Sequence, residues 1–259
     1  MPIFDSHAHY DDAAFDEDRE ALLAALPSKS VCGVVNAASN LASSRAGLAL
    51  AEKYPFVWAA VGLHPEDAAG AREEELAEYR MLAAHPRAVA IGEIGLDYHW
   101  EDACPRELQK LWFRRQLALA VELNKPVIVH DREAHEDVLT LLREYRPAGV
   151  VHCFTGSVEM MREVVKLGMS IGLGGAVTFK NARRPVEVAA AVPAERLLLE
   201  TDAHYMSPVP FRGKRNDSAL IAYTAAKIAE IRGIEVDTLL RQTEENARRL
   251  FLKGLDKPG

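Results

Sequence analysis

The chain has 259 residues, of which 49% are hydrophobic and 27% are charged, close to the composition of ordinary globular proteins. This composition excludes an intrinsically disordered chain, a collagen-like chain and a low-complexity chain. With 31 Lys and Arg against 38 Asp and Glu, the formal net charge is −7, so no general affinity for nucleic acid follows and any nucleic-acid site must be local.

Eight short runs of apolar and β-branched residues alternate with longer segments in which apolar residues recur every three or four positions, as expected of repeated strand–helix units. The expected strands are residues 2–7, 31–37, 57–63, 88–94, 126–130, 149–153, 169–173 and 197–201. Clear helical patterns cover residues 105–123 and 157–167, and two more, at 218–232 and 236–252, close the chain. Pro105 suits the first turn of its helix.

Eight strand–helix units predict the α/β class and a (β/α)8 TIM barrel, here a distorted one with extra C-terminal helices. Barrels of about 250 residues routinely form one domain. No linker rich in Pro, Gly or Ser interrupts the chain, so residues 1–259 are expected to form a single domain. In such barrels the active site lies where the strands end.

Polar residues with metal-binding or catalytic chemistry stand where the expected strands end. These residues are His7, His9, Asn36, His64, Glu93, His130, His152 and Asp202. Any one of them alone is most simply a polar residue that terminates a strand. However, five of the nine histidines stand at or just after an expected strand end, where the barrel would bring them together. The pattern therefore predicts one shared site.

His7 and His9, in the run DSHAH, suit one metal ion, because residues two apart on an extended segment project to the same side. The alternative is that they are two surface histidines. Their position directly after an apolar strand argues against this alternative. Glu93 lies inside the apolar run AIGEIGLDY, where an unpaired buried carboxylate would cost on the order of several kcal/mol. A salt bridge to an arginine is the alternative here, but the expected facing imidazoles favour a metal ion.

Three further candidate ligands end apolar runs: His130 ends PVIVH, His152 ends GVVH and Asp202 ends LLLETD. The six candidates exceed the four ligands of one tetrahedral site. Four imidazoles and two carboxylates fit two divalent ions bridged by a carboxylate, which would hold both the attacking and the leaving oxygen of a phosphodiester. A site with a single ion remains the alternative.

Seven motifs carry a resemblance to a known family. They are IFDSHAHYD (3–11), GLHPED (62–67), IGEIGLDY (91–98), PVIVHDREAHED (126–137), HCFTGS (152–157), LLLETD (197–202) and FRGKRN (211–216). With these motifs the chain resembles the TatD family of metal-dependent hydrolases, within the amidohydrolase-like superfamily, and the resemblance covers nearly its whole length. The resemblance implies a TIM barrel with deoxyribonuclease activity, usually as a 3′ exonuclease on DNA, and two divalent metal ions.

The resemblance also implies roles for individual residues. One ion would be held by His7, His9, Glu93 and Asp202, and the other by Glu93, His130 and His152, with Glu93 as the bridge. Glu93 and Asp202 are the expected catalytic residues, and Asp202 is also placed to accept a proton from the attacking water. Imidazole ligands and phosphoryl chemistry together suggest Mg²⁺, Mn²⁺ or Zn²⁺.

One position departs from the family pattern. Where the family usually has Glu-Thr-Asp-x-Pro-Tyr-Leu, this chain has His204 in place of the proline and Met206 in place of the leucine. No expected ligand is lost, but the rigidity and polarity of the loop beside Asp202 change. His204 is expected to be a partly exposed rim residue, with contact to a substrate phosphate as an alternative.

The expected substrate contacts are His64, Arg132, Arg212, Lys214, Arg215 and His204. Capping of a turn is a nearly equal alternative for His64, and pairing with a nearby carboxylate is the alternative for Arg132. Arg212, Lys214 and Arg215 form the densest basic cluster of the chain. Contact with a nucleic-acid backbone is expected for this cluster, with a solvated surface loop as the alternative.

These observations lead to one expected function and two alternatives. The expected function is hydrolysis of DNA phosphodiester bonds by metal-activated water, in a 3′–5′ exodeoxyribonuclease that acts on single strands or 3′ ends. An amidohydrolase-type hydrolase of a small amide, lactone or phosphoester is the first alternative, because a fold does not determine a function. A non-catalytic binding protein is the second. The specific motifs and the basic cluster favour the nuclease.

The sequence also favours a cytoplasmic protein. Cys32, Cys104 and Cys153 lie far apart and are odd in number, which argues against a disulfide framework. No run approaches the 18 apolar residues of a membrane span, and the chain reaches polar residues too early for a signal peptide. Neither a membrane nor an obligate protein partner is expected.

Overall fold

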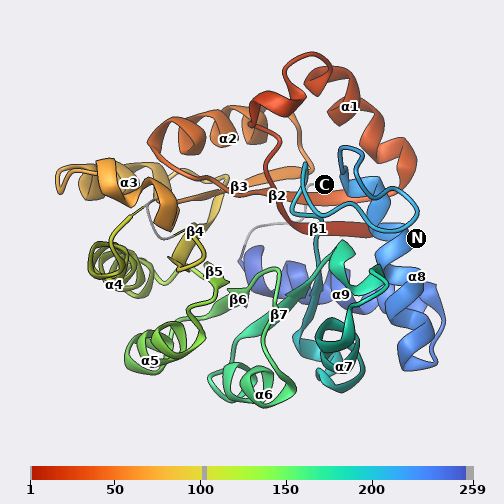
Figure 1. Ribbon diagram of the computed structural model, residues 1–259. Helices are drawn as coiled ribbons and strands as arrows, with labels where there is room; N and C mark the ends of the chain where they lie inside the picture. The colour runs from red at the N-terminus through yellow and green to blue at the C-terminus, as the bar shows by residue number, and fades with distance from the viewer. Residues whose placement is uncertain (1, 101–103, 255–259) are drawn as a thin grey trace.

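The computed structural model describes residues 2–100 and 104–254. Within these residues, eight parallel strands stand in sequence order, each paired with the next one along the chain. The strands are β1 (Ile3–Ala8), β2 (Val31–Asn36), β3 (Val57–Val61), β4 (Ala88–Asp97), β5 (Val127–Arg132), β6 (Gly149–Val151), β7 (Ser170–Leu173) and β8 (Leu197–Leu199). They lie at the centre of the molecule in Figure 1 and confirm the predicted (β/α)8 barrel.

Helices surround the strands (Figure 1). They are α1 (Arg19–Ala25), α2 (Leu41–Lys53), α3 (Glu75–Ala83), α4 (Arg106–Glu122), α5 (His135–Tyr145), α6 (Val158–Lys166), α7 (Arg183–Ala191), α8 (Ile221–Arg232) and α9 (Val236–Phe251). Short 3-10 helices are η1 (Ala13–Phe15), η2 (Leu26–Lys29), η3 (Pro65–Gly70), η4 (Gly175–Thr178), η5 (Ala194–Arg196) and η6 (Ser218–Leu220). The four predicted helices are confirmed, although Pro105 is extended and stands just before α4 rather than in its first turn.

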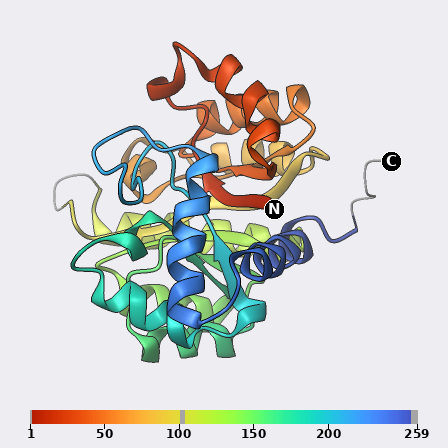
Figure 2. The same ribbon diagram turned by 90° about the vertical axis from the view of Figure 1, so that its right-hand side faces the viewer.

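The last two helices were predicted from the pattern at the end of the chain. α8 completes the eighth strand–helix unit, and α9 is additional: it lies behind the strands in Figure 1 and packs against β1 and β8. Figure 2 shows α9 at the side of the barrel away from the loops that follow the strands. Asn246 of α9 donates from Nδ2 to the carbonyl oxygens of Ala194 and Leu197, at 2.7 and 2.9 Å. α9 is thereby fixed at the end where the strands begin.

The two-residue period of a strand decides which side chains meet inside the barrel. Ile128 on β5 and Val150 on β6 belong to a buried apolar cluster with residues from other strands and from α9. His130 and His152 stand two residues farther along the same segments and therefore project to the same side. The apolar layer supports these two histidines at the carboxyl ends of their strands.

The barrel closes between β1 and the residues that follow β8. The amide of Asp202 donates to the carbonyl oxygen of His7 at 3.0 Å, and the amide of His9 donates to the carbonyl oxygen of Ala203 at 2.8 Å. Ala8 and Ala203 form an isolated parallel bridge. The backbone hydrogen bonds that close the barrel therefore involve three expected metal ligands.

The predicted distortion of the barrel includes irregular pairing at two places that contain expected ligands. The β1–β2 register is irregular between residues 5 and 8, and the β4–β5 register is irregular between residues 91 and 94. These intervals contain His7 and Glu93. The amide of Glu93 donates to the carbonyl oxygen of Ala38, beyond the end of β2, at 2.8 Å. The irregular pairing thus affects the direction in which these two side chains project from their strands.

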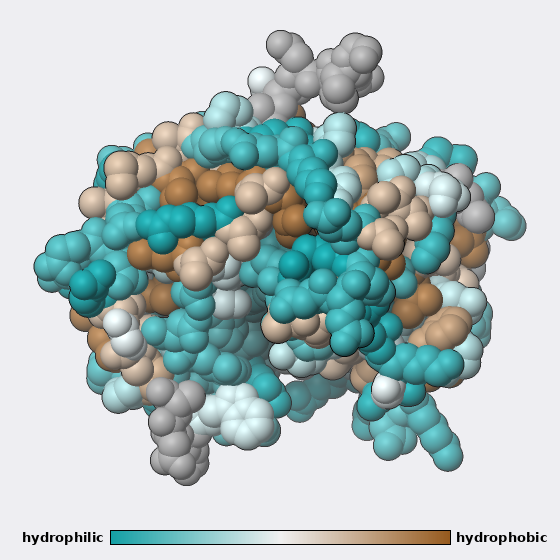
Figure 3. Space-filling view, turned by 90° about the horizontal axis from the view of Figure 1, so that it is seen from above, coloured by the Kyte–Doolittle hydropathy of each residue, from teal (hydrophilic) through white to brown (hydrophobic). Residues whose placement is uncertain are grey.

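The face seen from above is mostly hydrophilic, with smaller hydrophobic areas between the polar residues (Figure 3). Among residues 2–100 and 104–254, no helix has both the length and the apolar character that a membrane span requires.

The close approach of β4 to β5 leads to a stability prediction. Gly95 is paired with His130 and has a φ of +148°, which residues with a side chain rarely adopt. A Cβ at Gly95 would lie 2.0 Å from the carbonyl oxygen of His130. We expect Gly95→Ala to lower the free energy of unfolding by about 3 kcal/mol, because the strand pair must move apart. Chemical denaturation followed by circular dichroism measures this loss.

Gly70→Ala is the matched control. Gly70 is exposed, and a Cβ there would meet no atom within 4 Å, so the free energy of unfolding should change by less than about 1 kcal/mol. Equal stability of the two variants would contradict the prediction.

Candidate metal centre

The six side chains that were predicted as metal ligands meet at the carboxyl ends of the strands. They are His7 on β1, His9 just after β1, Glu93 on β4, His130 on β5, His152 just after β6 and Asp202 after β8. Residues so far apart in the sequence come together because all parallel strands of a barrel end at the same rim.

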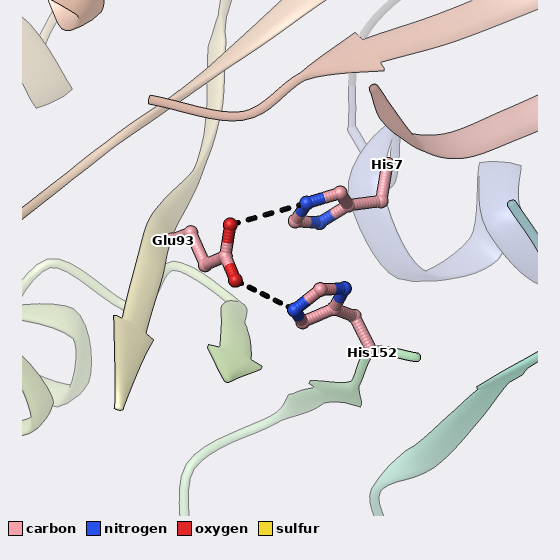
Figure 4. Close-up of side chains that lie close together, drawn as sticks. All are labelled: His7, Glu93 and His152. Atoms are coloured by element: carbon pink, nitrogen blue, oxygen red, sulfur yellow. Dashed lines mark ion pairs between the residues drawn. The ribbon is translucent and has the colours of Figure 1, made fainter. Parts of the chain in front are cut away.

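Glu93 is the centre of this cluster, and its side chain is only 3% exposed. Its Oε2 atom lies 3.2 Å from Nε2 of His7 and 3.4 Å from Nε2 of His9. Its Oε1 atom lies 2.7 Å from Nδ1 of His130 and 2.6 Å from Nε2 of His152. Figure 4 shows the carboxylate between His7 and His152, with one oxygen toward each. The two oxygens of Glu93 thus face two different pairs of imidazoles.

The surroundings of Glu93 keep it ionised. Burial by itself would raise the pKa of this carboxyl, because the charged form loses its hydration. The nearby imidazoles of His152, His7 and His64 outweigh burial and hold the pKa of Glu93 well below its usual range. A negative charge is therefore present at the centre of the cluster at neutral pH.

His7, His9 and Asp202 form one side of the cluster. The Nε2 atoms of His7 and His9 are 3.0 Å apart, and Oδ1 of Asp202 lies 3.6 and 3.4 Å from them. Nδ1 of His9 is 2.9 Å from the carbonyl oxygen of Ala37, which requires a proton on Nδ1 and makes Nε2 the nitrogen that faces the cluster. Burial raises the pKa of Asp202, but His9 and His7 bring it below its usual value. Asp202 is therefore ionised as well.

The other side contains two buried carboxylates to which the sequence analysis gave no role. Oδ2 of Asp97 lies 3.0 Å from Nε2 of His130, and Oε1 of Glu200 lies 3.7 Å from Nδ1 of His152. Burial lowers the pKa of His130, but the hydrogen bonds to Asp97 and Glu93 raise it to about 9. Carboxylates behind imidazoles orient the rings and make them better ligands. Both were present in recognised motifs, IGEIGLDY and LLLETD.

The donor set fits divalent metal ions. Among the described residues, three overlapping groups have ligand atoms that all lie within 4.8 Å of one another: His7, Glu93 and His152; His7, His9 and Asp202; and His64, Glu93 and His130. Imidazole nitrogens combined with carboxylate oxygens suit ions such as zinc and manganese. The ionised carboxylates supply negative charge, and the converging imidazole nitrogens would supply ligand atoms once a metal ion displaces their protons.

His64 lies nearer the centre than a capping role alone requires. It precedes η3, and its Nδ1 accepts from the amide of Glu66 at 3.3 Å, so the predicted cap is present. Its Nε2 lies 3.6 Å from Oε1 of Glu93. Burial lowers the pKa of His64 to about 3, so the imidazole is neutral. The structure therefore places His64 within the ligand cluster, where the sequence suggested a substrate contact.

Three of the predicted basic contacts are exposed, and their charges lie on aromatic rings. The guanidinium of Arg132, at the end of β5, is 5.5 Å from the centre of the Trp100 ring. Arg212 and Lys214 lie on the loop that follows β8, and the guanidinium of Arg212 is 3.7 Å from the centre of the Phe179 ring. These charges are directed to solvent beside the rim, and their predicted contact with the substrate stays a prediction.

Arg215 has partners within the protein. Its Nη1 and Nη2 atoms lie 2.8 and 2.6 Å from the two carboxylate oxygens of Asp18. Nη1 also donates to the carbonyl oxygen of Ala14 at 2.8 Å. Arg215 therefore fastens the loop after β8 to the segment after β1, which gives it a structural role in addition to the substrate contact that was predicted.

His204 is half-buried on the rim. Its Nδ1 lies 3.5 Å from Oδ1 of Asp12, and its ring centre is 3.9 Å from that of Tyr205. This position agrees with the rim residue expected from the sequence. The alternative contact with a substrate phosphate stays a prediction.

Comparison with known proteins gives the same family as the motifs. The family model described as TatD related DNase matches residues 4–252. The chain is 44% identical to the uncharacterized metal-dependent hydrolase YabD of Bacillus subtilis, over 96% of this chain and 98% of YabD. It is 36% identical to the 3′-5′ ssDNA/RNA exonuclease TatD of Musicola paradisiaca, over 97% of this chain and 98% of that protein.

A solved structure agrees with these relatives. The crystal structure of YJJV, a TatD homolog from Escherichia coli K12, matches with a TM-score of 0.90 at 34% identity, over 96% of this chain and 98% of that chain. Both the fold and the family inferred from the motifs are confirmed. The cluster around Glu93 offers candidate ligands for a metal ion, and the chain belongs to the TatD family of metal-dependent hydrolases.

Proposed function

We propose that this hydrolase is a 3′–5′ exonuclease that removes nucleotides from single-stranded ends of DNA with the help of two divalent ions. One observation carries the proposal: the two oxygens of the buried Glu93 carboxylate face separate pairs of imidazoles. A carboxylate in this position suits a bridge between two ions. The relatives named 3′-5′ ssDNA/RNA exonuclease TatD support this choice of substrate.

In this proposal the cluster divides into two ligand sets that share Glu93. His7, His9, Glu93 and Asp202 would hold one ion, and Glu93, His130 and His152 would hold the other. Divalent ions at such a site polarise phosphoryl oxygens and favour deprotonation of water at neutral pH. The set suits Mg²⁺, Mn²⁺ or Zn²⁺.

The chain's own residues then have distinct tasks. Asp202 is ionised and stands at the rim, so its carboxylate accepts the proton of the attacking water. Asp97 accepts a hydrogen bond from Nε2 of His130 and keeps that ring in place, and Glu200 places a negative charge near the ring of His152. No covalent intermediate with the protein is needed, because the nucleophile is water.

Positive charge around the rim would hold the substrate backbone. Arg132, Arg212 and Lys214 are exposed beside the metal ligands, and their cations would contact phosphates of the strand that enters the site. We also propose that the protein acts in the cytoplasm and without an obligate protein partner, as the sequence suggested.

The test uses purified protein from which metal has been removed by chelation. Mg²⁺, Mn²⁺ or Zn²⁺ is added back, and 5′-labelled single-stranded DNA, RNA and a panel of small amides and lactones are followed in parallel. The proposal expects a metal-dependent ladder of DNA products that shorten one nucleotide at a time from the 3′ end. Hydrolysis of an amide or lactone without any degradation of nucleic acid would overturn it.

The bridging position of Glu93 leads to a prediction about metal content. We expect Glu93→Ala to lower kcat by more than about 100-fold, the upper end of what the loss of an outer-shell partner of a metal ligand costs. The variant should also lose affinity for both ions, because Glu93 is shared. Elemental analysis of dialysed protein and steady-state kinetics measure the two effects.

Two further variants sharpen this test. His9→Ala should weaken only one ion, so its residual metal content should exceed that of Glu93→Ala. Glu187→Ala removes an exposed carboxylate on α7 that pairs with Arg183, and it should leave both quantities unchanged. Retention of two ions and of wild-type turnover by Glu93→Ala would exclude the bridge.

The exposed basic residues lead to a prediction about salt dependence. We expect Arg212→Gln combined with Lys214→Gln to raise KM for single-stranded DNA about tenfold and to flatten the log–log salt dependence by about 1.4, since each lost phosphate contact removes roughly 0.7 in single strands. Metal content should stay at the wild-type value. Kinetics at several salt concentrations give both numbers.

Lys29→Gln combined with Lys166→Gln is the matched control. Both lysines are exposed and precede a strand, so they lie at the opposite end of the barrel, and the net charge changes by the same amount. An equal change of the salt slope in both double variants would mean that net charge matters rather than contact, and the assignment of Arg212 and Lys214 would be withdrawn.

A further inference from the structure

A cavity of about 450 Å³ lies between the loop at residues 204–215, which begins two residues after Asp202, and Phe179 and Ala14. We call it the loop cavity. Its lining includes Tyr205, Arg212 and Lys214. A volume of this size is within the range of pockets that hold small organic ligands.

Two flat groups line the loop cavity, the guanidinium of Arg212 and the ring of Tyr205, and each packs against a neighbouring ring. The guanidinium of Arg212 lies 3.7 Å from the centre of the Phe179 ring. The ring of Tyr205 lies 3.9 Å from that of His204 at an angle of 38°. The side chain of Tyr205 is 57% exposed, so much of its ring is free for a ligand.

The loop that carries these groups is fixed to the metal centre. The amide of Tyr205 donates to the carbonyl oxygen of Asp202 at 2.8 Å. The buried Asn216 donates from Nδ2 to the carbonyl oxygens of Tyr205 and Thr201, at 2.8 and 3.0 Å. Arg215 adds its pair with Asp18. A ligand in the loop cavity would therefore lie at a set position relative to Asp202.

The chemistry of the walls selects one class of ligand. An aromatic ring and a guanidinium plane are the surfaces on which unstacked nucleobases are held, and the cations beside them suit the phosphate attached to the base. A small amide or lactone offers neither a large flat face nor a negative charge. The observations therefore favour a nucleotide over the other substrates of this class of fold.

We propose that the loop cavity binds the base of a nucleotide that adjoins the scissile phosphate, with the base against Tyr205 and Arg212. This inference rests on the proposed nuclease function, and it adds a site that recognises the base. Since every base has a flat face, the site tolerates any sequence but requires an unpaired base. It thus gives the enzyme its requirement for a single-stranded end.

The test is a cycle of variants and substrates. Single-stranded oligonucleotides carry an abasic residue at the 3′-terminal or the penultimate position, and kcat/KM is measured for the wild type, Tyr205→Ala and Tyr205→Phe. Loss of base stacking corresponds to about 5- to 150-fold. Tyr205→Ala should lose about tenfold on the intact strand and less than about twofold on one of the two abasic strands, while Tyr205→Phe should behave as the wild type.

Tyr223→Ala is the matched control. Tyr223 is 43% exposed and touches Phe211 of the same loop, but it does not line the cavity. It should match the wild type on all substrates. Equal losses in Tyr205→Ala and Tyr223→Ala, or an unreduced loss in Tyr205→Ala on both abasic strands, would overturn the loop-cavity proposal. Failure of the wild type to degrade any oligonucleotide would instead overturn the nuclease function itself.

Discussion

A buried carboxylate that keeps its charge determines how the mouth of this barrel is built. Glu93 is ionised although its side chain is 3% exposed, and a buried charge is tolerated only where donors and cations surround it. One strand cannot supply them, because neighbouring side chains point to opposite faces. Imidazoles that stand on or follow β1, β3, β5 and β6 reach the same carboxylate instead. The barrel therefore brings imidazoles from four separate segments of the chain to one acidic residue.

The seam between β1 and β8 keeps these ligands in register. The carboxylate of Asp5 accepts from the amide and the hydroxyl of Thr201, at 3.0 and 2.6 Å, and from the hydroxyl of Ser218 at 2.7 Å. It also accepts from the amide of His7 at 3.2 Å. Asp5 is fully buried, and this burial raises its pKa to about 7. Because Thr201 precedes Asp202, ligands from the two ends of the chain are held by one buried group.

The sequence predicted the strands, and it singled out six candidate ligands that the structure brings together, because both signals are local: an apolar run, and a polar residue at its end. The outer carboxylates lacked such a signal. Asp97 lies beyond Gly95, where β4 was expected to have ended. The role of Glu200 depends on its approach to His152, which follows β6, two strands away in the barrel. The basic cluster was predicted as one unit, yet Arg215 pairs with Asp18, 197 residues earlier in the chain. A contact between residues so far apart in the sequence arises only when the barrel closes, so no local sequence pattern predicts it.

The charge of the chain bears on the form of nucleic acid that it accepts. A duplex carries one negative charge per about 1.7 Å of its axis, and a body with a net charge of −7 repels such a rod wherever the two surfaces run side by side. Arg132, Arg212 and Lys214 supply positive charge at the rim, as would any metal bound by the cluster, and this field fades over roughly 8 Å at physiological salt. Attraction is therefore confined to the last few phosphates of a strand that enters end-on. The same acidic surface that argues against general affinity for nucleic acid thus supports the proposed preference for single-stranded ends.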